Sequence, residues 1–439
     1  MTTAQESDFM VRVGPGTPMG NLIREYWIPA CLSSELVADG PPMRLLLLGE
    51  KLIAFRDTAG HVGILDQRCP HRAASLYFGR NGDNGLRCAY HGWKFDVDGQ
   101  CRDMPNLPPH QDFSHKVRAK AYPVSERNGL VWAYMGPRET PPPMPMLEPT
   151  LLGEHEVVYR VFQRECNWLQ ALEGDIDTSH FGFLHAGAVD LADLDPQDPS
   201  RFVLLNKTPE YHVKDSDWGT TYSAYRPADP GQTHHRLAHF LLPFWTYPPE
   251  GRFNDNVITQ AWVPMDDTHT MVYHIAWKTR PIPPRALKGN QIVPGLESRY
   301  EYRPNSTDWY GRWRFVANRE NDYLMDNEAR ATVSYCGITG VSIQDQAITE
   351  SMGPTTDHTW EHLAPSDRMI IATRKRLVAA AHALAEDGRT PPAVDNPECQ
   401  LGARAGSFIA DTQLEWIDAY EQQLETAANP TGKLTARVT

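Results

Sequence analysis

The sequence lacks the features of a membrane protein and of a nucleic-acid-binding protein. No apolar run reaches the roughly 18 residues of a membrane-spanning helix, and residues 1–16 contain no apolar core of signal-peptide length. Lys and Arg number 42 against 55 Asp and Glu, which gives a net charge of −13. Because nucleic acids and anionic membranes attract basic surfaces, this balance argues against both partners.

Cysteine is also scarce. Seven cysteines are spread over 439 residues, and their number is odd. This is poor material for a disulfide framework and is typical of a reducing compartment, so we expect a cytoplasmic protein. The chain is long enough for two well-filled domains, and its 41% of hydrophobic residues is enough to build their cores.

The first third of the chain reads as a small β domain. Short apolar runs alternate there with turn residues, which is typical of antiparallel strands and hairpins. The runs are 43–48, 52–57, 61–65 and 131–136. The proline-rich stretch 137–146 then predicts a linker, because it suits neither a strand nor a helix.

The remainder mixes strands and helices. The candidate strands are 155–163, 256–264 and 270–278. A helix is expected at 366–387 with Ser366 as its cap, and another at 412–427 that opens with a capping box from Thr412 to Glu415. The pattern predicts an α+β protein with three parts. These are a lead-in that packs on the β domain (1–40), the β domain (41–140) and a larger domain with C-terminal helices (141–439).

Two Cys/His pairs form the first candidate metal site. Cys69 and His71 are separated by one residue, sixteen residues follow, and Cys88 and His91 are separated by two. Thiolates and imidazoles suit either zinc or an iron–sulfur cluster. A zinc finger normally places its two cysteines together and its two histidines together, whereas each pair here supplies one of each. That arrangement allows two cysteines to hold one iron and two histidines the other.

A second candidate site has the spacing Asp177-x-x-His180-x4-His185. Two histidines and one carboxylate on one face of Fe(II) form a facial triad that leaves positions open. Histidines five residues apart lie roughly 140° apart on a regular helix, so a helix here must end or distort near Gly182. Taken alone, this pair is better explained as two unrelated histidines in an aromatic-rich stretch.

Four segments together resemble the Rieske non-haem iron aromatic ring-hydroxylating oxygenases. They are CPHR (69–72), CAYHGWKF (88–95), EGDIDTSHFGFLH (173–185) and IQDQAITESMGP (343–354). The chain is most similar to the catalytic (alpha) subunits of the phthalate 4,5-dioxygenase-like group. The resemblance implies an N-terminal all-β Rieske [2Fe-2S] domain followed by a helix-grip (START-like) catalytic domain with a curved antiparallel sheet.

The resemblance also implies roles for the metal-binding residues. The residues expected to hold the [2Fe-2S] cluster are Cys69, His71, Cys88 and His91. The residues expected to hold one mononuclear Fe(II) are His180, His185 and Asp345. Glu350 and Asp357 compete with Asp345 for the place of the carboxylate ligand.

Asp177 matches the aspartate that in this family bridges a Rieske histidine of one subunit to an iron-ligating histidine of its neighbour. Such a carboxylate fixes the orientation and tautomer of the imidazole. The plain alternative is a surface aspartate. The resemblance implies homotrimers in a head-to-tail arrangement, or hexamers of two stacked trimers.

Residues 222–249 are expected to form part of a substrate pocket. Their aromatic side chains suit a planar ring, and Arg226 and Arg236 each suit a carboxylate through a bidentate fork. Ordinary solvated arginines are the alternative. A third ligating histidine among His234, His235 and His239 is conceivable, but Asp345 fits the two-histidine, one-carboxylate pattern better.

The implied function is the oxygenase component of a multicomponent enzyme that uses O2 to dihydroxylate a phthalate-like aromatic carboxylate. An NADH-linked flavin or ferredoxin reductase must be a separate protein, because the chain has neither a GxGxxG fingerprint nor a ferredoxin-type cysteine run. A Rieske monooxygenase or an O- or N-demethylase is the alternative. Two rivals from other classes are a Rieske electron carrier without mononuclear iron and a zinc-stabilised binding protein.

Overall fold

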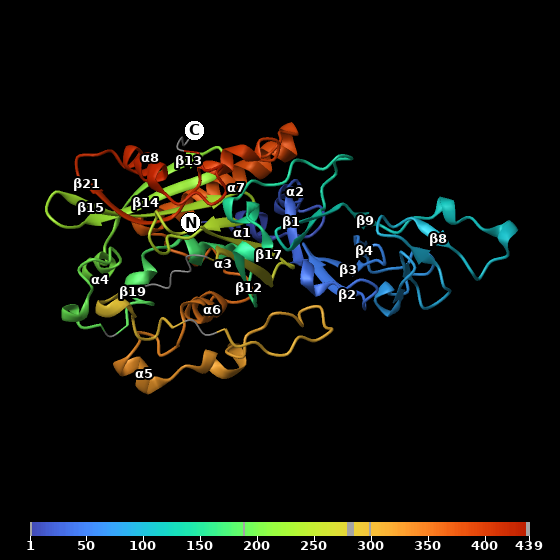
Figure 1. Ribbon diagram of the computed structural model, residues 1–439, viewed down its shortest axis with the longest axis horizontal. Helices are drawn as coiled ribbons and strands as arrows, with labels where there is room; N and C mark the ends of the chain where they lie inside the picture. The colour runs from blue at the N-terminus through green and yellow to red at the C-terminus, as the bar shows by residue number, and fades with distance from the viewer. Residues whose placement is uncertain (1, 188, 279–284, 298–299, 436–439) are drawn as a thin grey trace.

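The computed structural model describes residues 2–187, 189–278, 285–297 and 300–435. Figure 1 shows a small β region, drawn in blue to cyan, beside a larger region in which helices cover a sheet. The order of a β domain followed by an α+β domain is therefore as the sequence predicts. Among the described residues, no helix is long and apolar enough to cross a membrane.

The small β region consists of three antiparallel sheets, ordered β1-β11-β10, β2-β3-β4-β9 and β5-β6-β7-β8. The expected strands are found as β2, β3, β4 and β11. The strands are β1 (Trp27–Leu32), β2 (Met43–Leu47), β3 (Glu50–Arg56), β4 (Val62–Asp66), β5 (Arg80–Asn81), β6 (Leu86–Arg87), β7 (Lys94–Phe95), β8 (Cys101–Asp103), β9 (Ala121–Tyr122), β10 (Val124–Arg127) and β11 (Leu130–Tyr134).

The lead-in (1–40) forms two short helices, α1 (Ala4–Val11) and α2 (Pro18–Arg24), and then the strand β1, which pairs with β11 of the β domain. On the β-domain side, Arg24 donates to the carbonyl of Leu48 and pairs with Glu50 at 3.0 Å. Both helices also contact α7 (Arg368–Asp387) of the large region. The lead-in thus packs on both regions and not on the β domain alone. We retain the boundaries at residues 40 and 140 as a proposal.

The large region is built on an eight-stranded antiparallel sheet in which β12-β18-β17-β16-β15-β14-β13 lie in that order. The strand β21 pairs with the same edge of β15 as β16 does, further along the strand. The strands are β12 (Val157–Arg164), β13 (Glu210–Ser216), β14 (Gly219–Pro227), β15 (Gln232–Leu241), β16 (Trp245–Tyr247), β17 (Ile258–Pro264), β18 (Thr270–Trp277) and β21 (Gly406–Asp411), with a separate hairpin of β19 (Arg285–Leu287) and β20 (Gln291–Ile292).

Helices cover both faces of this sheet. Alternate residues of a strand point to opposite faces, and on β15 the odd-numbered Leu237 packs against Phe408 and against Tyr420 of α8. The opposite face contacts α3 and α7. The helices of the region are α3 (Trp168–Ile176), α4 (Arg201–Leu205), α5 (Asn327–Thr332), α6 (Val341–Ser351), α7 and α8 (Trp416–Thr426).

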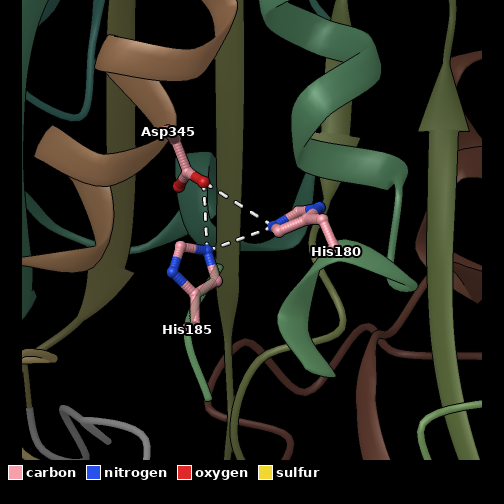
Figure 2. Close-up of side chains that lie close together, drawn as sticks. All are labelled: His180, His185 and Asp345. Carbon is pink, nitrogen blue, oxygen red and sulfur yellow. Dashed lines mark hydrogen bonds and ion pairs between the residues drawn. The ribbon is translucent and has the colours of Figure 1, made fainter. Parts of the chain in front are cut away.

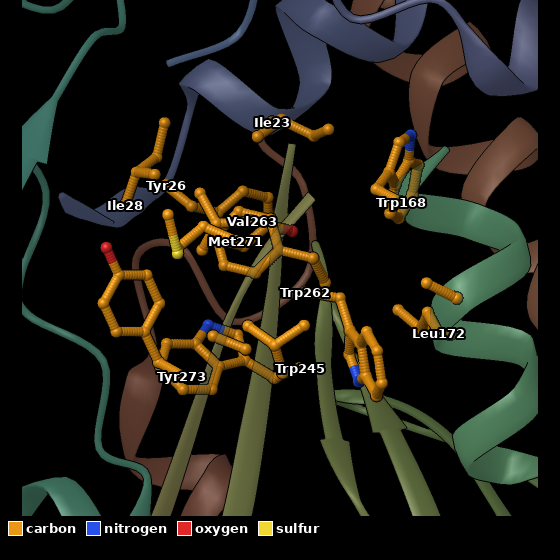
Figure 3. Close-up of a cluster of buried hydrophobic side chains, with 14 of the residues drawn as sticks. Ile23, Tyr26, Ile28, Trp168, Leu172, Trp245, Trp262, Val263, Met271 and Tyr273 are labelled. Atoms are coloured by element: carbon orange, nitrogen blue, oxygen red, sulfur yellow. The ribbon is translucent and has the colours of Figure 1, made fainter. Parts of the chain in front are cut away.

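A continuous apolar core joins the two regions (Figure 3). It includes side chains from α2, β1, α3 and the strands β16, β17 and β18, drawn there with their aromatic rings packed together. Trp245 of β16 stacks on Trp132 of β11 with ring centroids 5.7 Å apart, and the hydroxyl of Tyr273 donates to the carbonyl of Ala30 at 2.8 Å. Since these side chains are almost completely buried, the core fixes the small β region against the large sheet.

Two helix starts differ from the sequence prediction. The helix expected at 366–387 begins after Asp367, and Ser366 makes no cap bond to it. The helix expected at 412–427 begins only at Trp416, and the Thr412–Glu415 capping box is absent. Thr412 instead continues the pairing of β21, because its amide donates to Gly231 and its hydroxyl pairs with Thr233. Thr412 therefore extends the strand pairing and does not cap the helix.

Candidate metal centres

The first Cys/His site is formed by two loops of the small β region. The amide of Cys69 donates to the carbonyl of Ala74, and the amide of Cys88 donates to that of Trp93, so each pair lies in a tight turn. Ala73 and Gly92 have φ of +59° and +77°, which allow these turns to close. The two histidine rings lie together, with centroids 4.5 Å apart, and the Cys88 side chain contacts that of Cys69.

The donor set of this site fits a two-iron cluster. Both thiols are buried, and burial, with the neighbouring Cys88 thiol adding to it, raises the pKa of Cys69 to about 11. Thiolates at such a position need a bound cation. The buried Nδ1 of His91 makes no hydrogen bond with the described residues. Two neighbouring thiols and two neighbouring imidazoles, one with an unpartnered ring nitrogen, fit the donor set of a [2Fe-2S] centre of the Rieske kind.

The second site is assembled from α3, a turn and α6. Helix α3 ends at Ile176, earlier than the expected end near Gly182, because the side chain of Asp177 accepts from the amide and the hydroxyl of Ser179. His180 then opens a short 3-10 turn and His185 follows it. Asp345 comes from the second turn of α6, 160 residues further along the chain.

Three ligand atoms of this site converge, as Figure 2 shows. Nε2 of His185 lies 3.0 Å from Oδ1 of Asp345 and 3.1 Å from Nε2 of His180. The distance between Nε2 of His180 and Oδ1 of Asp345 is 3.6 Å. One ion can contact all three atoms. His185 is 2% exposed, while His180 and Asp345 keep 26% and 29% of their side chains open. Two imidazoles and a carboxylate on one side of an ion fit the facial triad of Fe(II).

The charges at this site are coupled. Burial disfavours a charged His180, but the nearby carboxylates of Asp177 and Asp345 outweigh it and raise its pKa. Burial likewise opposes ionisation of Asp345, and the two histidines reverse this and lower its pKa. The carboxylate is therefore ionised at neutral pH, as a ligand must be.

Both competing carboxylates are occupied elsewhere. Glu350 accepts from the amide of Glu165 at 2.9 Å and from the hydroxyl of Tyr323 at 2.7 Å. Asp357 caps its own turn through Thr359. Asp345 is the one of the three carboxylates that reaches His180 and His185.

Another group of possible ligands, Glu173, His358 and Glu361, lies outside this centre. Arg374 donates to both of its carboxylates at 2.6–2.9 Å. The guanidinium thus fills the position that a metal cation would take.

Asp177 lies beside the triad. One of its carboxylate oxygens is 3.5 Å from Nδ1 of His180, and the other is held by Ser179. Its side chain remains 24% exposed. The position suits a carboxylate that orients the His180 ring and is still open to a further partner.

Arg226 and Arg236 lie on the face of the large sheet that looks toward the triad. Arg226 pairs with His234 across β14 and β15, so these two and Arg236 share one face. The guanidinium of Arg236 lies 4.7 Å above the ring of Phe181. On the next strands of the same face, Thr246 and Gln260 donate to Asp175 of α3.

The histidine-dense patch does not supply a ligand. His235 and His239 point to the opposite face, where Ser223 and Thr221 hold their Nδ1 atoms. His234 is fully buried and neither of its ring nitrogens has a hydrogen-bond partner among the described residues.

Sequence reasoning missed Gln344, Gln260 and Asp175. Gln344 contacts His185 and directly precedes Asp345, which is the one signal that the sequence offers. Gln260 and Asp175 meet only through tertiary packing, so no spacing marks them.

Comparisons with known proteins match both regions. The family model of the Rieske [2Fe-2S] domain matches residues 26–123, and the model described as "LigXa C-terminal domain like" matches residues 133–432. The chain is 46% identical over 430 residues to the 3-chlorobenzoate-3,4-dioxygenase oxygenase subunit of Comamonas testosteroni, covering 97% of this chain and 99% of that one. It is 34% identical over 441 residues to the phthalate 4,5-dioxygenase oxygenase subunit of Pseudomonas putida, covering 95% and 94%.

Among solved structures, dicamba monooxygenase bound to dicamba superposes with a TM-score of 0.55 at 17% identity, covering 84% of this chain and 100% of that one. This likeness supports the fold alone. The two relatives that match nearly the whole chain are oxygenase subunits, which excludes the electron-carrier and zinc-protein alternatives. The chain therefore belongs to the Rieske non-haem iron oxygenases, as an oxygenase subunit that acts on aromatic compounds, carries a [2Fe-2S] cluster and a mononuclear iron, and takes O2 as co-substrate.

Proposed function

We propose that this subunit dihydroxylates an aromatic carboxylate, with electrons that a separate NADH-linked reductase supplies. The same proposal assigns the metal ligands. Cys69, His71, Cys88 and His91 hold the cluster, and His180, His185 and Asp345 hold the mononuclear iron. When bound, the iron activates O2 with electrons from the cluster. The chain's own residues bind the substrate, orient it and exclude water.

The observation that carries the proposal is a pair of buried arginines that form no direct ion pair; Glu250 and Asp177 act on the charge of Arg236 only from further away. Arg226 and Arg236 are 1% and 6% exposed. Among the described residues, no carboxylate forms an ion pair with either guanidinium, and Arg236 donates only to the carbonyl of Pro249. Nε and Nη1 of Arg226 and Nη1 of Arg236 have no hydrogen-bond partner there.

Two unpaired guanidiniums are costly to bury, so the pocket favours an anion. Burial, together with the charge of Arg236, lowers the pKa of Arg226 only to about 10, and it therefore stays charged at neutral pH. Neutral donors also lie near the pair: the buried hydroxyls of Tyr211 and Tyr222 have no hydrogen-bond partner among the described residues and are close enough to act on the charge of Arg226. A planar carboxylate satisfies the fork of an arginine through two parallel hydrogen bonds.

The relatives support the same substrate class. 3-Chlorobenzoate and phthalate, which the two relatives' names give, are both aromatic carboxylates. We therefore propose a benzoate-type ring whose carboxylate lies between the arginines, with the carbon to be oxidised toward the triad.

Substrate binding tests this proposal. Arg236→Met and Arg226→Met should each weaken the binding of 3-chlorobenzoate and phthalate by about 10- to 100-fold, because a hydrogen bond to a charged group is worth about 1.5–3 kcal/mol. The dissociation constants come from calorimetry on the protein with its cluster and iron in place. Binding of the uncharged probe 3-chlorotoluene should not weaken. Arg389→Met, at a side chain that is 71% exposed, is the matched control. Equal losses for charged and uncharged probes would rule out the carboxylate site.

Product analysis with ¹⁸O2 separates dihydroxylation from the alternatives. A cis-dihydrodiol with two labelled oxygens supports the proposal. A phenol with one labelled oxygen, or loss of an O- or N-methyl group, would assign the subunit to the monooxygenases or demethylases instead.

We also propose a cytoplasmic protein that assembles as a head-to-tail trimer or stacked hexamer. None of the seven cysteines, all of which lie among the described residues, forms a disulfide bond, which supports a reducing compartment.

A further inference from the structure

Gln344 is fully buried, and its side-chain amide contacts His185. Its Nε2 lies 3.1 Å from the carbonyl oxygen of Gly295 and 2.7 Å from that of Ile338. Because carbonyl oxygens only accept, the amide group must donate one proton to each of them. Its Oε1 is then the atom that lies 2.5 Å from Nδ1 of His185. Two backbone carbonyls therefore set the orientation of the amide.

This orientation selects one tautomer of His185. A neutral imidazole carries its proton on one nitrogen and a lone pair on the other. Since Oε1 of Gln344 accepts, Nδ1 of His185 must donate, and the lone pair lies on Nε2. Nε2 is the atom that converges with Asp345 and His180. The other tautomer would place a proton between the three ligand atoms.

Of the two carbonyls that bind Gln344, that of Gly295 is held in place by its surroundings. Gly295 has φ +86°, and a Cβ at this position would lie 2.7 Å from Cβ of Ser334. Its carbonyl also accepts from the amide of Gly340, the residue that precedes α6. One carbonyl thus positions both the start of α6 and the amide of Gln344.

We propose that Gln344 is a positioning residue that locks His185 in the Nδ1-protonated tautomer and so presents Nε2 to the mononuclear iron. The inference rests on the proposed role of His185 as a ligand. Hydrogen-bond partners of a ligating histidine typically change metal affinity by about 10- to 100-fold when they are replaced.

The test compares Gln344→Met with Gln344→Glu. Both variants lose the donors to Gly295 and Ile338, but only glutamate keeps an acceptor for Nδ1 of His185. Gln346→Met is the matched control, because Gln346 is buried on the same helix and lines a different cavity with Arg303 and Arg314. The mononuclear site is emptied with a chelator and titrated anaerobically with Fe(II), and in parallel with Co(II) to record its visible spectrum. The absorption of the Rieske cluster verifies that each variant is folded.

We expect Gln344→Met to weaken Fe(II) binding by about 10- to 100-fold and to change the Co(II) spectrum. Gln344→Glu and Gln346→Met should bind within a few-fold of the wild type. An equal loss in Gln344→Met and Gln344→Glu would mean that the amide acts only by supporting the loop, and would overturn the inference. Wild-type affinity in Gln344→Met would do the same. His185→Ala tests separately whether His185 is an iron ligand, because unchanged iron binding in that variant would refute the ligand assignment itself.

Discussion

At the scale of single residues, Asp175 shows how the pocket controls charge. Gln260 and Thr246 donate to its carboxylate. Burial raises its pKa to about 8, and the charges of Glu250 and Asp345 add to the rise while the Thr246 hydrogen bond opposes it. At neutral pH the group is therefore largely protonated, which limits the negative charge on this wall of the pocket, as the proposed carboxylate substrate would need.

This shift has a consequence for stability. The pKa in the folded state lies above the unfolded value of about 3.9, so folding favours the protonated form. The contribution is present below pH ~4 and is lost as pH rises toward 8. Asp175→Asn cannot ionise, so its thermal midpoint relative to the wild type should rise between pH 6 and pH 8.5. A difference that is the same at both pH values would contradict the raised pKa. Differential scanning fluorimetry of the two proteins measures it.

Single residues also show which parts of the candidate site could be predicted from the sequence. Asp345 was separable from Glu350 and Asp357 only through the resemblance, whereas the structure gives a physical reason, since Tyr323 and Thr359 occupy the other two. Arg226 and Arg236 could be proposed as substrate-binding residues, but the sequence could not show whether they form ion pairs within the protein. Whether Arg226 has a counter-ion depends on what faces it across the pocket, and the sequence does not contain that fact.

At the scale of elements, the link between α3 and α7 supports the metal site. Arg374 of α7 is 8% exposed and binds Glu173 of α3 through two hydrogen bonds and Glu361 through two more. Helix α3 leads directly into the turn that carries His180. The position of this turn therefore depends on how firmly α3 is held.

Replacing Arg374, which Glu173 and Glu361 share, should lower the free energy of unfolding. Arg374→Met leaves two carboxylates with low exposure, 9% and 21%, and breaking such a buried pair costs about 3–5 kcal/mol. The midpoint of urea unfolding, followed by far-UV circular dichroism, measures the loss. The double variant Arg374→Met, Glu173→Gln removes one stranded charge and should recover part of it. No recovery would indicate that packing of the arginine stem, rather than charge, holds the helices together.

Element boundaries were predictable where the local pattern was strong. Four strands of the β domain (β2, β3, β4 and β11) and the long helix α7 were expected within a few residues of their bounds. The start of α8 was not, because Thr412 pairs with β15. The end of α3 was also misplaced, since the side chain of Asp177 terminates the helix and the sequence points only to the later Gly182.

At the scale of the whole molecule, two metal sites lie in separate regions. Figure 1 places β8 and the neighbouring loops at one end and α3 and α6 toward the other. The order of the two domains could be predicted, but the order of strands in the large sheet could not, since β15 contacts β14, β16 and β21 at once. The segment around Trp309, which packs against the core of the β domain, likewise had no local signal.

This separation leads to a prediction about the assembly. Asp177 is bound to Ser179 through one oxygen, faces His180 with the other and remains 24% exposed, so it has room for a partner from another subunit. If electrons pass from the cluster of one subunit to the site of the next, a subunit without a cluster and a subunit without iron should complement each other. His71→Ala and His185→Ala provide the two parents, and each should be inactive alone.

Co-expression with two different tags yields the hybrid oligomer. In a head-to-tail trimer of either composition one junction joins an intact cluster to an intact iron site, so the hybrid should show about a third of wild-type turnover. Adding Asp177→Asn to the His71→Ala subunit, which keeps its iron site, should abolish most of this activity when it is compared at an iron content matched to that of the hybrid. A hybrid as inactive as its parents would mean that the two centres of one chain work together, and the oligomer would then have no part in electron transfer. Visible absorption and iron analysis of the same samples establish that each subunit carries only the centre intended.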